Sequence, residues 1–204
     1  MNKIIHFMDF VSETLKKLGN EFRWQRYTDK HYHQSVLEHT LLMVILASIC
    51  INYEKKKNPT TVLDGYKVLT YLAIHDLTES VTTDIPYMQK NSFDKKDFYA
   101  RMDRKAIVEI TKKYPLFFKR VIRNLFNQID FTETEKEFIE AMERIEYVLY
   151  AANEYFVHHH REFLGVLQYQ MPNLKNLSQR FACVGYIIKD IIPHMPKNII
   201  ADVL

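Results

Sequence analysis

Apolar residues recur every three or four positions along most of the chain, the spacing that gathers them on one face of an α-helix. This pattern predicts helices over residues 4–18, 35–53, 62–75, 98–114, 116–129, 132–155, 161–169 and 177–192. Gly19 and Asn20 are a stop signal for the first of them. Residues 21–34 are polar and aromatic without a clear period, and we expect an irregular segment there.

Two of these helices carry a recognisable start. Ser35 is expected to cap the second predicted helix, with Glu38 three residues later as its capping-box partner. Thr132 and Glu135 repeat the same arrangement before the long helix that follows. We expect the second helix to finish in a solvated tail, Glu54–Lys57.

Composition supports a helical fold. Only four glycines and six prolines occur in 204 residues, and so few turn-forming residues favour long helices over many short strands. Apolar residues make up 47% of the chain, enough for a well-buried core. There is no internal repeat, low-complexity linker or break in composition. We therefore predict an all-α fold in which residues 1–204 form a single helical-bundle domain.

Charge and cysteine usage narrow the class of protein. The 28 basic and 25 acidic side chains leave a formal charge of +3, without the clustering that a nucleic-acid surface needs. Cys50 and Cys183 lie far apart in apolar runs, and we expect buried free thiols in a reducing compartment. The most apolar run, Leu41–Ile51, is about half the length of a membrane span, and no signal peptide is visible. We expect a soluble, cytoplasmic protein without nucleic-acid or membrane partners.

The adjacent pair His75 and Asp76 is the first sign of chemistry. One imidazole and one carboxylate can bind the same cation, and this donor set suits Mn²⁺, Co²⁺, Fe²⁺, Ni²⁺ or Zn²⁺ better than Mg²⁺. A His-Asp dipeptide alone recurs by chance. Here Glu79 follows Asp76 by three residues, so a helical turn would direct both carboxylates towards the same cleft. Upstream, His39 lies on the helix that Ser35 opens.

Four segments together form a longer pattern: Arg23-Trp24, then Ser35-Val36-Leu37-Glu38-His39, then His75-Asp76-Leu77-Thr78-Glu79-Ser80-Val81-Thr82-Thr83-Asp84-Ile85-Pro86, and finally Lys90. With this order and spacing, the sequence resembles the HD-domain phosphohydrolases, most closely their bacterial 5'-deoxynucleotidase branch. The resemblance covers roughly residues 20–155. It implies a helical bundle of the HD type with a divalent transition metal at its centre.

The resemblance also implies roles for single residues. His39, His75 and Asp76 would be metal ligands. Glu79 would be the catalytic carboxylate that orients and deprotonates the attacking water.

Four further residues would bind the substrate according to the same resemblance. Arg23 and Lys90 would hold the phosphate, while Trp24 and Asp84 would contact the sugar and the base.

The last ligand departs from the family's pattern. The family has an aspartate in a late helix, and here Glu143 stands at that position, with Glu146 one turn later. Glutamate is longer by one methylene group, so it can bind the metal only with a different rotamer or a helix set slightly further back. Either Glu143 or Glu146 could supply the ligand.

The function implied is a metal-dependent 5'-nucleotidase acting on (deoxy)nucleoside monophosphates, with dimerisation expected from the resemblance alone. One alternative within the same chemistry is a deoxynucleoside triphosphate triphosphohydrolase. An alternative of another class is a catalytically degenerate module that binds metal and nucleotide, which the Glu143 substitution motivates.

Three consecutive histidines, His158–His160, invite a second metal site. Successive residues on a helix point about 100° apart and cannot converge on one ion. We expect an exposed or interfacial run.

Overall fold

The computed structural model describes residues 3–24, 34–84, 96–127 and 130–195, together with residues 197 and 200. Within these residues the regular structure is helical, and the one extended pairing is an isolated antiparallel bridge between Phe22 and Ser35. The prediction of an all-α fold is confirmed. The chain forms two compact units, Met1–Leu41 with Thr70–Ile129 and Leu42–Leu69 with Asp130–Leu204. The assignment of all 204 residues to a single domain stays a prediction.

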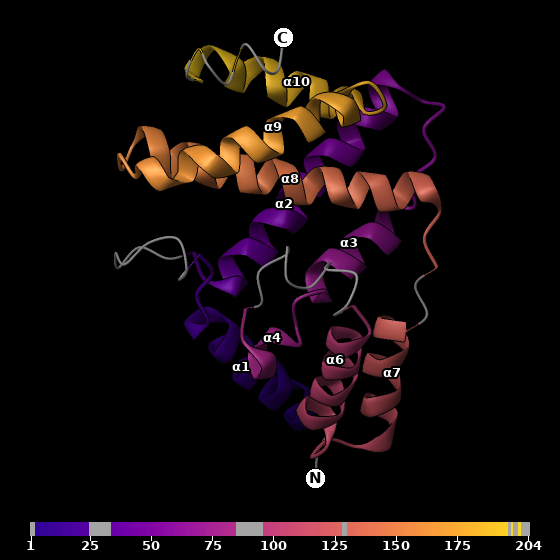
Figure 1. Ribbon diagram of the computed structural model, residues 1–204. Coiled ribbons are helices and arrows are strands. Elements are labelled where there is room, and N and C mark those ends of the chain that lie inside the picture. Colours follow the sequence, from indigo (N-terminus) through magenta and orange to yellow (C-terminus); the bar gives the residue numbers. More distant parts are fainter. Residues whose placement is uncertain are drawn as a thin grey trace. The chain divides into compact units, whose positions relative to one another are not determined.

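The first unit contains α1 (Lys3–Asn20), α4 (Glu79–Thr82), α6 (Lys96–Thr111) and α7 (Leu116–Asn127), with the start of α2 (Val36–Lys57) and the end of α3 (Gly65–Ile74) (Figure 1). Its core is formed by Phe10, Leu18, Val36, Leu77, Ile107, Tyr114 and Ile122. The Phe10 ring meets Tyr114 and Phe118 edge-on, with ring centroids 5.4 and 4.7 Å apart. Leu77 anchors the turn that follows α3 in this core. Burial of such a side chain stabilises the folded protein by about 2 kcal/mol.

The second unit contains most of α2, the start of α3, and then α8 (Glu133–Phe156), η1 (Arg161–Phe163), α9 (Leu164–Ser178), α10 (Ala182–Ile191) and η2 (Ile192–His194) (Figure 1). Helix α9 packs against both α8 and α10. The fully buried side chains at its core include Phe138, Met142, Ile145, Phe163, Leu167, Met171, Leu174 and Phe181.

Both predicted capping boxes are confirmed. The backbone N–H of Ser35 donates to the Glu38 carboxylate at 2.8 Å, and the Ser35 hydroxyl accepts the Glu38 N–H at 3.2 Å. Thr132 and Glu135 make the same reciprocal pair at 2.8 and 3.2 Å. These bonds satisfy N–H groups that every helix start leaves without a helical partner.

The tail predicted for α2 is partly wrong. Lys55, Lys56 and Lys57 are exposed, but Glu54 is buried, and its carboxylate accepts the backbone N–H of Cys183 at 2.6 Å. Glu54 follows the buried Cys50 by four residues and so shares its face of α2. The helical periodicity of α2 places Glu54 on this face, and the distant N–H of Cys183 compensates for the burial of its carboxylate.

The prediction of buried free thiols is confirmed for Cys50 and Cys183. A hydrogen bond with Cys50, together with burial, raises the pKa of the Cys183 thiol. The Cys183 thiol therefore stays protonated at neutral pH.

Helix α2 is long and apolar enough to cross a membrane, the one such helix in the described part of the chain. The same test is passed by core helices of soluble proteins, and α2 carries the buried ionisable side chains His39 and Glu54. A cytoplasmic location stays a prediction.

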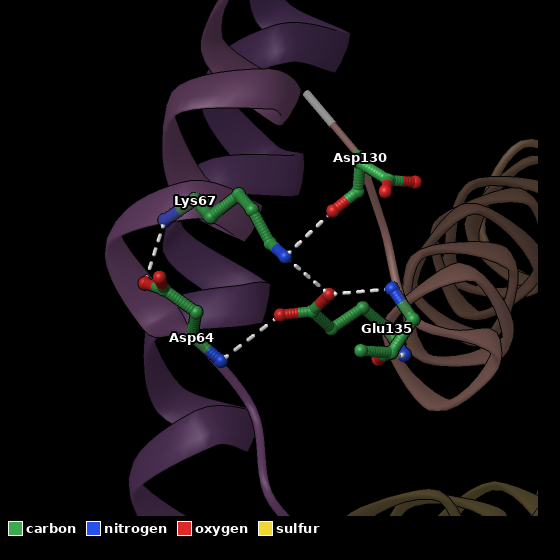
Figure 2. A network of polar contacts seen from close by, with 5 residues as sticks. Asp64, Lys67, Asp130 and Glu135 are labelled. Atoms are coloured by element: carbon green, nitrogen blue, oxygen red, sulfur yellow. Dashed lines mark hydrogen bonds and ion pairs between the residues drawn. The ribbon is translucent and has the colours of Figure 1, made fainter. Parts of the chain in front are cut away.

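Figure 2 shows a polar network that joins the start of α3 to the start of α8. Asp64 caps α3, because its carboxylate accepts the backbone N–H of Lys67 at 3.0 Å. The Lys67 ammonium lies 2.6 Å from the Glu135 carboxylate and 2.9 Å from the carbonyl oxygen of Asp130. Glu135 also accepts the backbone N–H of Asp64 at 3.2 Å. One buried carboxylate thus fixes two helix starts.

The helices near the C-terminus differ from the prediction. We expected one helix to end at Tyr169 and another to begin at Leu177, but α9 runs without a break from Leu164 to Ser178 and includes Pro172. Proline inside a helix costs about 3 kcal/mol, since it removes a hydrogen bond and crowds the preceding turn. The complete burial of three large α9 side chains offsets that cost: Leu167, Met171 and Leu174.

The histidine run lies outside any helix, in the segment after α8. His158 and His159 are exposed as expected, but His160 is buried, and its Nδ1 lies 2.7 Å from the buried Glu154 carboxylate. The expectation was wrong for His160, because the chain reverses at His159, where φ is 59°.

Candidate active site

The turn after α3 carries the predicted His-Asp pair. The N–H of Leu77 donates to the carbonyl of Ile74 at 2.9 Å, and that of Glu79 donates to the carbonyl of Asp76 at 3.0 Å. The backbone therefore continues from α3 in tight turns until α4 begins at Glu79. Because Leu77 is buried in the core of this unit, the turn has a fixed orientation.

His39, His75 and Asp76 converge on one point. The Asp76 Oδ2 atom lies 3.1 Å from Nε2 of His75 and 3.4 Å from Nε2 of His39. One ligand atom from each residue lies within 4.8 Å of the other two, so the three could hold a single ion. Two imidazole nitrogens and one carboxylate oxygen are a donor set that transition metals favour.

The orientation of the His75 ring is set by the backbone. Its Nδ1 lies 2.8 Å from the carbonyl oxygen of Leu72, which can only accept a hydrogen bond. Nδ1 therefore carries a proton, and Nε2 faces Asp76. Nε2 is a donor to Asp76 when the ring is protonated, and it offers a lone pair to a cation when the ring is neutral. A backbone carbonyl behind the ring is a usual partner of metal-binding histidines.

The Asp76 carboxylate is held in its charged form. Burial acts to raise the pKa of Asp76, but the charge of His75 and hydrogen bonds from His39 and His75 outweigh that effect and hold the pKa well below its usual range. Asp76 is thus ionised at neutral pH, the state in which it can bind a cation.

Glu79 lies one turn beyond Asp76 and is only 3% exposed. Residues three apart in a helical turn share a face, so Glu79 follows the direction of Asp76. Burying a carboxylate is costly unless its charge is compensated, and such groups concentrate at functional sites.

Arg23 and Trp24 are brought together beside the start of α2. The Arg23 N–H donates to the carbonyl of Gln34 at 2.8 Å, next to the Phe22–Ser35 bridge. The Arg23 guanidinium carbon lies 5.7 Å from the centre of the Trp24 ring. Arg23 is buried and Trp24 half-buried.

Glu21 links this segment to its neighbours. Its carbonyl accepts the N–H of Val36 at 2.9 Å, and its carboxylate accepts the N–H of Asp84 at 3.0 Å. Asp84 follows Thr83, which has a φ of 66°, and Trp24 has the same value. Such backbone costs about 1–3 kcal/mol in residues other than glycine and is maintained where surrounding contacts impose it.

Comparison with known proteins identifies the family. The model of the HD domain matches residues 15–180. This chain belongs to the HD-domain family. The search of curated proteins found no significant match.

Solved structures share the fold of this HD-domain protein. A Listeria innocua HD-domain phosphohydrolase superimposes with a TM-score of 0.73 at 16% identity, covering 96% of this chain and 92% of its own. A predicted metal-dependent phosphohydrolase from Magnetospirillum magnetotacticum superimposes with a TM-score of 0.57 at 17% identity, covering 94% of both chains. A Pyrococcus horikoshii protein superimposes with a TM-score of 0.58 at 16% identity, covering 96% of this chain and 98% of its own. Together with the described helices, they establish an all-α HD fold.

The remaining predicted site residues of this HD-domain protein are Lys90 and Glu143, with Glu146 as the alternative ligand. Lys90 falls outside the described residues, as do Ile85 and Pro86 of the motif. Glu143 is half-buried and Glu146 fully buried, both on α8 in the second unit. The catalytic, metal-binding and substrate-binding roles of all the predicted site residues stay predictions.

Sequence reasoning missed Gln34 and Glu21. Gln34 stands directly before the predicted cap Ser35, and Glu21 directly after the first predicted helix. Glu21 and Gln34 are the first and last residues of the segment predicted to be irregular, and this position was the one signal in the sequence.

Proposed function

We propose that this HD-domain protein is a divalent-metal-dependent phosphohydrolase that removes phosphate from (deoxy)nucleoside 5'-monophosphates. The observation that carries the proposal is the convergence of His39, His75 and Asp76, with the buried carboxylate of Glu79 one turn later. The HD family and the fold shared with two phosphohydrolases support the same reaction type.

The residues present fit a metal ion. Nε2 of His75, Nε2 of His39 and Oδ2 of Asp76 would hold it, with Glu143 or Glu146 as the proposed last ligand. The donor set favours Mn²⁺, Co²⁺, Fe²⁺, Ni²⁺ or Zn²⁺ over Mg²⁺. When bound, the ion supplies a Lewis acid for a phosphoryl oxygen and lowers the pKa of a water molecule.

Glu79 is the proposed general base. Its carboxylate would orient the attacking water and accept its proton, a contribution worth about 10²–10⁴ in rate. The burial of Glu79 keeps competing solvent away from that proton transfer.

Arg23 and Trp24 are the proposed substrate contacts. A guanidinium offers paired N–H donors that match phosphate oxygens, and an indole ring offers a flat apolar face to a sugar or a base. Asp84 would accept hydrogen bonds from the sugar or base, and Lys90 would add a positive charge near the phosphate. Phosphoryl transfer depends mainly on positioning and charge neutralisation, which this set supplies.

Product analysis tests the substrate class. We expect inorganic phosphate from nucleoside 5'-monophosphates and slower or no reaction with triphosphates. Release of intact triphosphate from deoxynucleoside triphosphates would instead favour the triphosphohydrolase of the same fold.

Glu143→Asp distinguishes an enzyme from a degenerate binding module. If the native glutamate is a working ligand, activity in the variant is unchanged or falls. Activity that appears only in the variant would show that the native protein binds metal and nucleotide without turnover.

A further inference from the structure

One oxygen atom of Gln34 joins the two proposed substrate contacts. The Gln34 Oε1 atom lies 3.2 Å from Nη1 of Arg23 and 3.3 Å from Nε1 of Trp24. Both nitrogens can only donate hydrogen bonds, so the atom between them must be the amide oxygen and not the amide nitrogen. Gln34 is 5% exposed and Arg23 is 6% exposed, which shields both bonds from water.

The backbone around Gln34 strengthens this arrangement. The Gln34 carbonyl accepts the Arg23 N–H at 2.8 Å, so Gln34 binds the Arg23-Trp24 pair at three points. Trp24 has a φ of 66°, a backbone conformation that tryptophan adopts only where its surroundings impose it. The hydrogen bond that the Trp24 indole donates to Gln34 is one contact that stabilises Trp24 in that backbone conformation.

Gln34 is also joined to the metal cluster through the chain. It precedes Ser35, the cap of α2, and His39 follows four residues later on the same helix. The position of Arg23 and Trp24 is therefore tied to the helix that carries a metal ligand.

We propose that Gln34 is a positioning residue that sets Arg23 and Trp24 in the orientation required to bind the nucleotide, an inference that rests on the proposed function. A shared acceptor orients the guanidinium and the indole together, so phosphate and base recognition depend on the same side chain. The Gln34 amide is neutral, so its hydrogen bond orients Arg23 without adding a negative charge beside the guanidinium. Side chains fixed before binding lose less entropy when the ligand arrives.

Steady-state kinetics with a nucleoside 5'-monophosphate test this role. Gln34→Met has a similar length and no acceptor, and we expect it to raise KM at least tenfold while kcat stays within about threefold. Gln34→Glu keeps an acceptor but pairs the charge of Arg23, and we expect KM to rise about threefold or more. An unchanged KM in either variant contradicts the proposal, and Gln34→Glu decides alone if Gln34→Met does not fold.

Gln170→Met is the matched control. Gln170 is also buried, and its Oε1 accepts a hydrogen bond from Nη1 of Arg144 at 2.6 Å. Gln170→Met removes a similar hydrogen bond between a buried glutamine and an arginine. Gln170 lies on α9 and is not one of the proposed substrate contacts. We expect Gln170→Met to lower thermal stability as much as Gln34→Met does, with KM unchanged. If Gln170→Met raised KM as much as Gln34→Met, the effect of Gln34→Met would be general destabilisation.

Fluorescence separates this inference from the proposed function. Trp24 is the single tryptophan of the chain, so intrinsic emission reports on it directly. In a metal-loaded Glu79→Gln background, a nucleoside 5'-monophosphate should change the emission saturably, with Kd at least tenfold weaker after Gln34→Met. Native turnover together with equal Kd values overturns the role of Gln34 alone. The absence of any turnover and of any emission change overturns both proposals.

Discussion

Asp76 illustrates how single atoms set the candidate site. Its Oδ2 faces Nε2 of both His39 and His75, and the protonated Nδ1 of His75 is fixed by the carbonyl of Leu72. The family resemblance of the sequence predicted all three as ligands, and the structure brings His39 on α2 close to His75 and Asp76 in the turn after α3. The sequence could not reveal that Gln34 joins Arg23 to Trp24, since a single polar residue next to an irregular segment has no pattern that predicts its partners.

The roles of Glu79 and His75 can be separated by mutation. Glu79→Gln should lower kcat by about 10²–10⁴ while the protein keeps its metal, because the proposed base is lost and the ligands are not. His75→Ala should lose both the metal and turnover. Elemental analysis together with phosphate release checks this, and a Glu79→Gln protein without metal would contradict the assigned roles.

At the scale of elements, caps and buried faces were predictable but several helix ends were not. The capping boxes at Ser35 and Thr132 rest on local hydrogen bonds that four residues encode. The end of α9 depends on packing against α8 and α10, which overrides the local effect of Pro172. The burial of Glu54 likewise follows from a distant partner, the N–H of Cys183.

Pro172→Ala tests whether α9 is continuous. Alanine would restore the missing helical N–H and relieve crowding, so we expect the free energy of unfolding to rise by about 1–3 kcal/mol. Urea denaturation measures the change. A neutral or destabilising result would indicate that the helix ends before Pro172, as the local sequence alone suggested.

The Lys67–Glu135 network should make stability depend on pH. Burial acts to raise the pKa of Glu135, but hydrogen bonds from Lys67 and from the backbone of Thr132 and Asp64 lower it below its ordinary value. A lowered folded-state pKa stabilises the protein above the unfolded value of about 4.3, and this contribution is lost as pH falls through the folded pKa.

Lys67→Met should therefore lower the free energy of unfolding by about 2 kcal/mol at pH 7. The difference in this free energy between the variant and the native protein should become smaller below about pH 4. Lys136→Met is the control, because Lys136 pairs with Glu133 on the exposed surface, where a much smaller loss of stability is expected. Denaturation at several pH values provides the comparison. A Lys67→Met difference independent of pH would contradict this account of Glu135.

At the scale of the whole molecule, the HD fold persists at 16–17% identity to solved structures. Apolar residues at helical spacing recur along most of this chain, which is why the fold class was predictable from sequence. In the proposed function, substrate identity would depend on a few side chains around Arg23 and Trp24, whose arrangement comes from tertiary contacts. The sequence pattern therefore predicts the type of reaction more readily than the substrate.

Metal-dependent phosphate release tests the central claim most directly. Metal-stripped native protein and the Asp76→Asn variant would be offered a deoxynucleoside 5'-monophosphate, with Mn²⁺ or Co²⁺ added back. We expect release by the native protein only after metal is restored, and none by Asp76→Asn. Release that survives metal removal or persists in Asp76→Asn would contradict a catalytic metal at His39, His75 and Asp76.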